Sequence, residues 1–395
     1  MDYRYIVFLV LAIFLIFRLY VKITYKFWAY QPVFHYYNLF YWMYPKGIIN
    51  KDLPIANKYC NFIDITTKNF LDISSSEVTS IVTLLSNNYY REKDLSYIPT
   101  KKSFTADFIG HTDPTFISLY NKTIYDQVEG QIHKENKLIG IITGKPITIN
   151  INKITMSAYY VDYLCVDKLY RNQNIAPQLI QTYEYTQRHQ NQKSVISLFK
   201  REGVLTGIVP LTAYKAKQYY ISTMPKQLDN NNVIKITTQN YYLLEDLIKN
   251  IDFFDCIIQP SLSHLVNLIK EEIYLIYGLL DNAKLSTCYF FKQNNTIYRE
   301  TELYTNNIKE STCIDLIASI NTVNENDFID SFIVALKKVN INYNYINIEE
   351  TSNNYIITYH LKTLSLIPRI TMPIAYFYYN YAKRPVPSDK VLILI

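Results

Sequence analysis

Residues 158–177 read AYYVDYLCVDKLYRNQNIAP, and they predict a strand, a loop and the first turn of a helix in succession. The aromatic and β-branched residues of 158–166 are typical of a strand. Pro177 suits the first turn of a helix, where a missing backbone N–H costs nothing, and we expect that helix to extend to about Gln190. Residues 171–176 therefore form a loop that enters a helix N-terminus.

This loop has the features of an anion-binding site. Its backbone N–H groups and the positive end of the helix dipole can hold a diphosphate, and Arg171 would add a charge-assisted contact. Asn174 is compatible with a left-handed backbone, which Asn adopts more readily than most residues. An ordinary strand–loop–helix junction is the alternative interpretation, and the loop alone does not decide between the two.

Helical and β-rich runs alternate on both sides of the loop. Before it, residues 76–88 have the helical spacing of apolar residues, and residues 137–143 are strand-like. After residue 220, we expect helices at 241–250, 260–276 and 328–339 and strands at 287–292 and 297–305. This order predicts a mixed α/β fold in two units, with a boundary near residue 215.

Composition narrows the class of protein. The 395 residues carry a formal net charge of +6 that is scattered rather than gathered in a stripe, so we expect no nucleic-acid partner. The five cysteines are odd in number and form no CxxC pair, which argues against a disulfide framework and a zinc site. We therefore expect no metal ion and no permanently bound cofactor.

The N-terminal segment is a candidate membrane anchor. Residues 5–17 form an unbroken apolar run that continues after Arg18 to Val21. A cleaved signal peptide would need a small-residue cleavage site and a core helix would need an amphipathic pattern, and neither feature is present. Because Arg18, Lys22 and Lys26 follow the run, the positive-inside rule predicts a single-pass anchor with the rest of the chain in the cytoplasm.

Several short motifs carry a family resemblance. The pattern R-x-x-N-x-A at 171–176 resembles the loop with which GNAT acyltransferases hold the pyrophosphate of coenzyme A. Together with Tyr163–Val166 and Ile175–Pro177, it resembles the acyl-CoA signature of glycylpeptide N-tetradecanoyltransferases, the N-myristoyltransferase family. Other pieces resemble this family in the same order: Tyr25–Trp28 with Gln31–Val33, Leu84–Leu85 with Asn88–Tyr89, Leu138–Gly140, and Gly203–Val204 with Thr212.

The resemblance implies an α/β fold of two GNAT-like halves, with mixed β-sheets flanked by helices. An anchor at residues 1–23 would precede an acyl-CoA-binding half at 24–215 and a peptide-binding half at 216–395. The implied function is transfer of a myristoyl (C14) group from myristoyl-CoA to the N-terminal glycine of protein substrates. Myristoyl-CoA would then be a cosubstrate.

The resemblance also implies roles for individual residues. The backbone N–H groups of Tyr163 and Leu164 would form the oxyanion hole for the thioester carbonyl. The terminal carboxylate of Ile395 would be the base, with the Thr212 hydroxyl as a second contact to the amine. The residues implied to bind coenzyme A are Tyr25, Lys26, Phe27, Trp28, Cys165, Val166, Arg171, Asn172, Gln173, Asn174, Ile175 and Ala176.

The last residues give physical support to a buried carboxylate. Residues 391–395 read VLILI, and such an apolar end is expected to be buried. Burial raises the pKa of a carboxyl group, and it lowers the pKa of an adjacent ammonium, so that proton transfer between them becomes feasible. The alternative is a terminal strand whose carboxylate lies at the margin of a sheet, and composition alone favours that alternative.

Departures from the family leave other functions open. Asp162 stands where the family has Asn, Asn172–Asn174 replace basic residues, and the family's acidic run becomes Arg91–Asp94 with two cations. One alternative is a degenerate acyltransferase that serves as a membrane-tethered binding or structural protein. The other is an acyltransferase with another acyl chain or acceptor, since the preferred chain length depends on the packing of a pocket and not on a motif.

Overall fold

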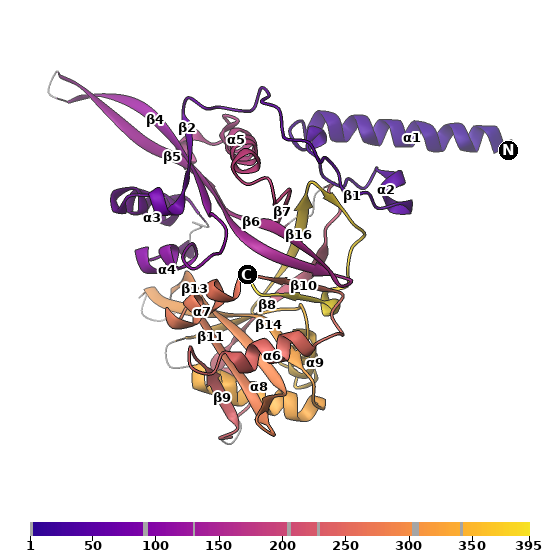
Figure 1. The fold of residues 1–395 in the computed structure, drawn as a ribbon, viewed down its shortest axis with the longest axis vertical. Helices are drawn as coiled ribbons and strands as arrows, with labels where there is room; N and C mark the ends of the chain where they lie inside the picture. Colours follow the sequence, from indigo (N-terminus) through magenta and orange to yellow (C-terminus); the bar gives the residue numbers. More distant parts are fainter. Residues whose placement is uncertain are drawn as a thin grey trace.

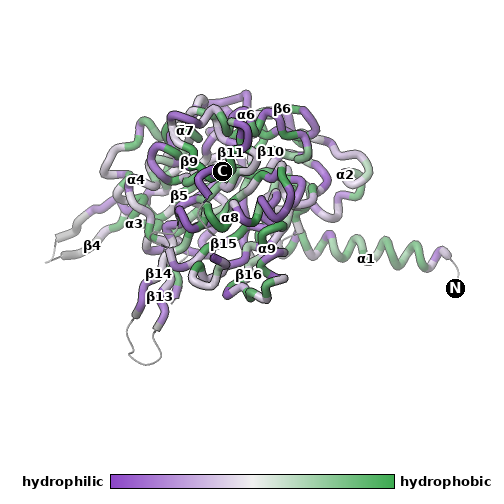
Figure 2. The backbone as a smooth tube through the Cα atoms, turned by 90° about the horizontal axis from the view of Figure 1, so that it is seen from below, coloured by the Kyte–Doolittle hydropathy of each residue, from purple (hydrophilic) through white to green (hydrophobic). Residues whose placement is uncertain are grey.

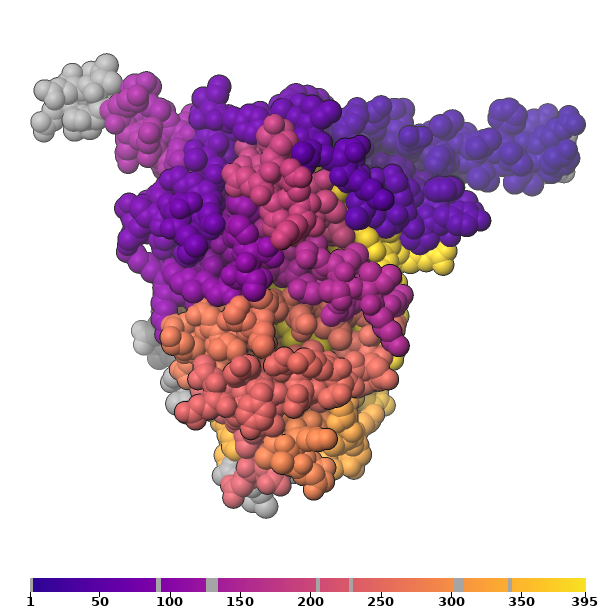
Figure 3. Space-filling model, viewed as in Figure 1, coloured from indigo at the N-terminus to yellow at the C-terminus, as the bar shows by residue number. Residues whose placement is uncertain are grey.

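The structure is a computed structural model that describes residues 3–89, 94–128, 131–203, 207–226, 230–301, 308–339 and 343–395. Two parts of the family's motifs lie outside the described residues, namely residues 91–93 and Val204. Figure 1 shows two α/β halves along the long axis of the molecule, with the C-terminus between them. In the space-filling view (Figure 3), the first half, indigo to magenta, lies over the orange second half, and the N-terminal helix extends outside both.

The first half is a mostly antiparallel sheet covered by helices. Its strands are β2 (Ile65–Asn69), β4 (Phe116–Val128), β5 (Gln131–Ile151), β6 (Ile154–Val166) and β7 (Ile196–Glu202), and its helices are α3 (Ser75–Asn88), α4 (Lys101–Ala106) and α5 (Ile175–Gln190). A capping box of Ser74 and Glu77 starts α3. The buried face of α3, with Ile81 and Leu85, packs in one cluster with Ile141 of β5.

The second half is built in the same way. Its strands are β8 (Thr212–Tyr220), β9 (Val233–Ile236), β11 (Tyr274–Asp281), β12 (Lys284–Leu285), β13 (Thr287–Thr301), β14 (Ile308–Asn321) and β15 (Tyr345–Glu349), and β3 (Leu95–Tyr97) pairs with β13. Its helices are α6 (Tyr242–Asn250), α7 (Leu262–Lys270), α8 (Glu325–Val339) and α9 (Asn354–Thr363). Phe328 and Phe332 of α8 pack against Tyr289 of β13, which anchors the helix to the sheet.

The two halves share one continuous sheet. β16 (Ile370–Tyr379) lies between β7 and β8 and is antiparallel to both. β10 (Cys256–Gln259) and β18 (Val391–Ile393) extend the edge of β5, because β10 pairs antiparallel with β5 and β18 pairs parallel with β10. A separate pair joins β1 (Gly47–Ile48) to β17 (Tyr381–Ala382). Strands from late in the chain thus complete the sheet of the first half.

β6 and β7 separate at the point where the candidate site lies. They pair in parallel from Ala158 with Ile196 to Val161 with Phe199. Beyond this point β6 stays paired with β5 and β7 with β16, so the two strands diverge. Helix α5, which connects them, packs so closely on β5 at Gly144 that a side chain there would clash with the Tyr183 hydroxyl. The divergence opens a space between the two strands and α5.

The N-terminal helix stands apart from the body. α1 (Tyr3–Thr24) is long and apolar enough to cross a membrane, and Val21 is the residue of α1 that is buried. Figure 2 shows a largely hydrophobic helix that projects from the rest of the chain. The short helix α2 (Leu39–Met43) follows in the chain, and its Leu39, Phe40 and Met43 are exposed.

Several predicted elements are confirmed, and two are wrong in detail. The predicted helices at 76–88, 241–250 and 328–339 correspond to α3, α6 and α8. The predicted helix at 260–276 ends too late, because α7 stops at Lys270, Glu272 has a left-handed backbone (φ 59°) and β11 begins at Tyr274. The strands predicted at 287–292 and 297–305 are one strand, β13, with an irregular register between Gln293 and Ile297 in place of a turn, and residues 302–305 lie outside the described residues.

Candidate active site

A bulge in β6 creates the first part of the site. Ile141 of β5 pairs with Cys165 and Thr143 pairs with Asp162, so the register skips the two residues between them on β6, Tyr163 and Leu164. Tyr163 has a left-handed backbone with φ 49°, which is a costly conformation for an aromatic residue. The two residues assigned to the oxyanion hole therefore form the bulge, outside the regular register of β5 and β6.

The N–H of Tyr163 already has a partner. It donates a hydrogen bond to Asp162 Oδ1 at 2.8 Å. Both residues line the cavity described below, together with Leu164. A thioester carbonyl that is to accept this N–H must therefore displace the Asp162 carboxylate.

A buried charge cluster holds the Tyr163 side chain. The Tyr163 hydroxyl donates to Asp107 Oδ2 at 2.8 Å, and Lys145 Nζ lies 3.2 Å from Asp107 Oδ1. Burial would raise the pKa of Asp107, but the ammonium groups of Lys145 and Lys292 lower it well below its ordinary value. Burial and the Asp107 charge raise the pKa of Tyr163, so the phenol stays protonated and anchors the bulge.

The loop at residues 171–176 has the backbone conformation that the sequence predicts. Asn174 is the N-cap of α5 with a left-handed backbone (φ 59°), and Asn172 is left-handed too (φ 64°). Pro177 lies in the first turn of α5, as predicted. A cavity of about 640 Å³ opens at this helix end, lined by Asn88, Tyr89, Leu164, Cys165, Val166, Tyr170, Arg171, Asn172, Asn174, Ile175, Ala176 and Pro177. We call it the loop cavity.

Arg171 has a structural role in the loop. Its Nη2 donates to the carbonyl oxygen of Asn88 at 2.7 Å and its Nε to that of Val166 at 3.2 Å, which ties the loop to the ends of α3 and β6. Cys165 also lines the loop cavity, and burial raises the pKa of its thiol to about 12. The thiol therefore stays protonated and acts as a small apolar side chain.

A second cavity of about 410 Å³ fills the space between β6, β7 and α5. Its lining is mostly apolar and aromatic, and comprises Trp28, Tyr89, Ile142, Val161, Asp162, Tyr163, Leu164, Ile180, Tyr183, Glu184, Ser197, Phe199, Lys200, Arg201, Glu202 and Tyr379. It shares Tyr89 and Leu164 with the loop cavity, so the two meet at the bulge. We call it the acyl cavity.

The N-terminal segment reaches the acyl cavity through one side chain. Trp28 stacks on Phe199 of β7 with ring centroids 5.6 Å apart, and Phe27 packs edge-on against Tyr59. Of the four residues Tyr25–Trp28, Trp28 lines the acyl cavity, whereas none of the four lines the loop cavity. Trp28 therefore covers the apolar part of the site.

Thr212 and Ile395 lie outside the two cavities. Thr212 pairs with Tyr376 of β16, and Tyr376 belongs to the same buried cluster as Ile395. Thr212 is 1% exposed, and its Oγ1 has no hydrogen-bond partner among the described residues. Ile395 is buried, as expected, and Leu394 donates its N–H to the carbonyl oxygen of Ile258 at 2.8 Å. Neither residue lines the acyl cavity or the loop cavity.

Sequence reasoning missed a buried ion pair beside the acyl cavity. Lys200 lines the cavity, its Nζ lies 2.7 Å from Glu349 Oε1, and the Tyr214 hydroxyl donates to the same carboxylate. Burial would lower the pKa of Lys200, but Glu349 raises it well above its ordinary value. The two charges lie on strands 149 residues apart, so no local pattern reveals the pair.

The fold and the site together define a class, the acyl-CoA-dependent N-acyltransferases. A bulged strand, a loop at a helix N-terminus and an apolar cavity between diverging strands meet at one point. Residues 54–211 match the family model described as Myristoyl-CoA:protein N-myristoyltransferase, N-terminal domain. The chain is therefore similar to the N-myristoyltransferase family.

Relatives and solved structures agree with this assignment. A putative glycylpeptide N-tetradecanoyltransferase of Amsacta moorei entomopoxvirus is 26% identical over 257 residues, which cover 63% of this chain and 68% of the relative. The Plasmodium falciparum glycylpeptide N-tetradecanoyltransferase is 26% identical over 181 residues, or 42% of this chain and 40% of the relative. A Saccharomyces cerevisiae N-myristoyltransferase structure with bound myristoyl-CoA has the same fold, with a TM-score of 0.71, 14% identity and coverage of 92% and 90%.

Proposed function

We propose that the protein transfers a myristoyl group from myristoyl-CoA to the N-terminal glycine of protein substrates. The observation that carries this proposal is the meeting of the loop cavity and the acyl cavity at Tyr89 and Leu164. A thioester of coenzyme A is the ligand that needs both an anion-binding helix end and an apolar cavity, with its reactive carbonyl at their junction.

In this reaction the loop and the bulge bind different parts of the thioester. Residues 171–176 and the N-terminus of α5 hold the phosphates, while Cys165 and Val166 line the path between the phosphates and the carbonyl. Of residues 25–28, Trp28 closes the acyl cavity from the N-terminal side. The N–H groups of Tyr163 and Leu164 stabilise the oxyanion, once the carbonyl has displaced the Asp162 carboxylate from Tyr163.

The peptide amine needs a base before it can attack. We assign this role to the terminal carboxylate of Ile395, with the free Thr212 Oγ1 as the second contact. The carboxylate takes a proton from the glycine ammonium, and the neutral amine attacks the thioester carbonyl. The C–S bond then breaks as a second proton passes from the amine to the sulfur, so that coenzyme A leaves as its thiol. This role requires that the carboxyl group of Ile395 be free, which mass spectrometry of the C-terminal peptide verifies directly.

We propose further that α1 anchors the protein in a membrane, with the catalytic part in the cytoplasm. The support is the apolar helix of 22 residues, whose side chains other than Val21 are outside the core, and the cations Arg18, Lys22 and Lys26 that follow its apolar run.

One experiment tests the reaction. The full chain in detergent micelles is incubated with myristoyl-CoA and a glycine-initiated peptide, and mass spectrometry reads the mass and position of any adduct. We expect an increase equal to a myristoyl group on the N-terminal amine. Binding of myristoyl-CoA without transfer would instead support a binding or structural protein, and acylation at a lysine or with another chain would support a different acceptor or acyl group.

A further inference from the structure

Glu184 is the lining residue of the acyl cavity that lies farthest along α5 from the loop cavity. Along α5, Ile175–Pro177 line the loop cavity, whereas Ile180, Tyr183 and Glu184 line the acyl cavity. At about 1.5 Å per residue, Glu184 lies about 13 Å along the helix axis from Ile175. An acyl chain whose thioester is at Leu164 and which extends away from the phosphates therefore runs toward Glu184.

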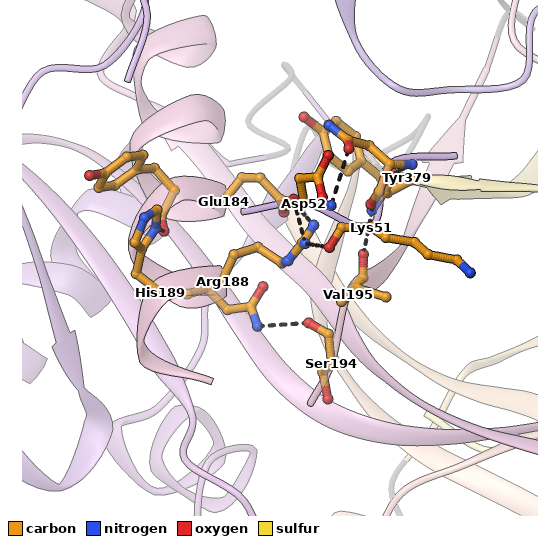
Figure 4. Close-up of polar contacts among 12 residues, drawn as sticks. Lys51, Asp52, Glu184, Arg188, His189, Ser194, Val195 and Tyr379 are labelled. Carbon is orange, nitrogen blue, oxygen red and sulfur yellow. Dashed lines mark hydrogen bonds and ion pairs between the residues drawn. The ribbon is translucent and has the colours of Figure 1, made fainter. Parts of the chain in front are cut away.

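The carboxylate of Glu184 is buried and poorly satisfied. Its partner among the described residues is Arg188, with Nη1 3.6 Å from Glu184 Oε1, and both side chains are more than nine-tenths buried. Arg188 directs its Nη2 to the backbone oxygens of Lys51 (3.3 Å) and Asp52 (2.9 Å) instead, as Figure 4 shows. Burial raises the pKa of Glu184 to about 7 in spite of the nearby guanidinium.

Other polar groups do not compensate Glu184. The neighbouring Tyr379 hydroxyl donates to Gln31 Oε1 at 2.7 Å. Glu184 also lines a separate cavity of about 690 Å³ beyond the acyl cavity, together with Gln181, whose buried Oε1 has no partner in the described part of the chain. Glu184 thus stands between the acyl cavity and a second cavity that contains an acceptor without a partner.

We propose that Glu184 is a specificity-determining residue, which selects acyl-CoA thioesters with a hydroxyl group at the ω-end over plain saturated chains of the same length. A methyl end that reaches the carboxylate displaces water and leaves the oxygen atoms without donors, which is unfavourable for a buried charged group. A terminal hydroxyl donates a hydrogen bond to the same oxygen atoms. The inference rests on the proposed function, because it takes the acyl cavity as the site of the acyl chain.

The test compares pairs of thioesters on the full chain in detergent. Dissociation constants are measured by calorimetry for the plain and ω-hydroxy acyl-CoA of 12, 14 and 16 carbons, and kcat/KM is measured with a glycine-initiated peptide. At the best-fitting length, we expect the wild type to prefer the hydroxylated chain by about tenfold or more in both quantities, as expected for a charge-assisted hydrogen bond.

The matched variant replaces the whole ion pair. In Glu184→Leu/Arg188→Met, no buried charge is left unpaired, and the preference should reverse in favour of the plain chain. Glu245→Gln serves as the control, because Glu245 forms the corresponding ion pair with Lys249 on α6 and lines neither the acyl cavity nor the loop cavity, and it should keep the wild-type ratio. If the double variant does not fold, Glu184→Gln is measured instead, because it keeps an oxygen acceptor for Arg188. The preference for the hydroxylated chain should then be smaller than in the wild type.

The outcomes separate this inference from the proposed reaction. Equal affinity of the wild type for plain and hydroxylated chains at all three lengths would overturn the inference, and so would an unchanged ratio in the Glu184 variants. Selective binding without transfer would support the role of Glu184 and contradict the acyltransferase reaction. Failure of every thioester to bind would overturn both.

Discussion

At the scale of single residues, Asp162 has the most direct effect on the proposed chemistry. Its carboxylate accepts the N–H of Tyr163, one of the two donors assigned to the oxyanion hole. A negative charge at this position repels the oxyanion that forms on the thioester carbonyl. The strained backbone of Tyr163, held by the hydrogen bond to Asp107, keeps the donor in place for either acceptor.

Replacing Asp162 by Asn should therefore increase the rate of transfer. Asn keeps a carbonyl oxygen for the Tyr163 N–H but removes the charge. Each ~1.4 kcal/mol by which the activation free energy falls corresponds to a tenfold faster reaction. We expect about tenfold faster acyl transfer in single-turnover measurements, with the affinity for myristoyl-CoA changed much less. A slower reaction in D162N would show that the carboxylate assists the reaction.

His264 gives the protein a predictable pH dependence of stability. Burial lowers its pKa to about 3, and the charges that face it are those of His111, Lys145 and Asp107. Because the unfolded chain binds a proton near pH 6.5 that the folded chain excludes, the free energy of unfolding falls as the pH is lowered below 6.5. We expect a loss of about 2 kcal/mol between pH 7 and 5 from this group, measured by urea unfolding.

The variant His264→Gln should remove this part of the pH slope. Ser263→Ala is the matched control, because Ser263 makes a hydrogen bond to the same turn, at Gly110, without a titrating group. An identical slope in wild type and H264Q would contradict the assignment.

At the scale of elements, the start of α5 depends on one left-handed residue. Asn174 caps the helix with φ 59°. A left-handed backbone costs a β-branched residue about 1–2 kcal/mol of conformational free energy, whereas Gly adopts it without this cost. We expect Asn174→Val to lower the free energy of unfolding by that amount and Asn174→Gly to leave it nearly unchanged, as measured by urea titration. Coenzyme A affinity should follow the same order, because the loop N–H groups are aligned by this turn.

The chain end that follows strand β18 provides the proposed base. If the Ile395 carboxylate is the base, adding two glycines after it should reduce turnover by about 10²–10⁴-fold, the usual contribution of a positioned base. The affinity for myristoyl-CoA should barely change, because Ile395 lines neither of the two cavities assigned to the thioester. Ile395→Leu keeps both strand and carboxylate and should be almost as active as the wild type. Normal turnover of the extended chain would refute the assignment.

At the scale of the whole molecule, α1 and the catalytic body are separable. The residue of α1 that is buried is Val21, which is 3% exposed. We expect the full chain to remain in membranes after alkaline extraction, whereas a chain without residues 1–20, which keeps Val21, should be soluble and retain the acyl-transfer rate. Release of the full chain by salt alone would indicate peripheral attachment, and a mature N-terminus after residue 17 would indicate a cleaved signal.

Much of the site could be predicted because its signals are local. Pro177 in the first helical turn and the left-handed Asn174 follow from conformational preferences of single residues. The end of α7 was missed, because the apolar residues after Lys270 continue a helical pattern although they belong to the buried strand β11. Periodicity does not distinguish a buried strand from a helix face over so few residues.

The sequence by itself determined the α/β class, the loop at the start of α5 and the apolar helix α1, since each depends on residues adjacent along the chain. Only the tertiary structure decided where β6 and β7 diverge, and with that the acyl cavity between them. It also decided that Lys200 meets Glu349 and that Arg188 turns from Glu184 to the backbone of residues 51 and 52. These contacts join segments more than 100 residues apart, and packing of the complete sheet, not any local preference, brings them together.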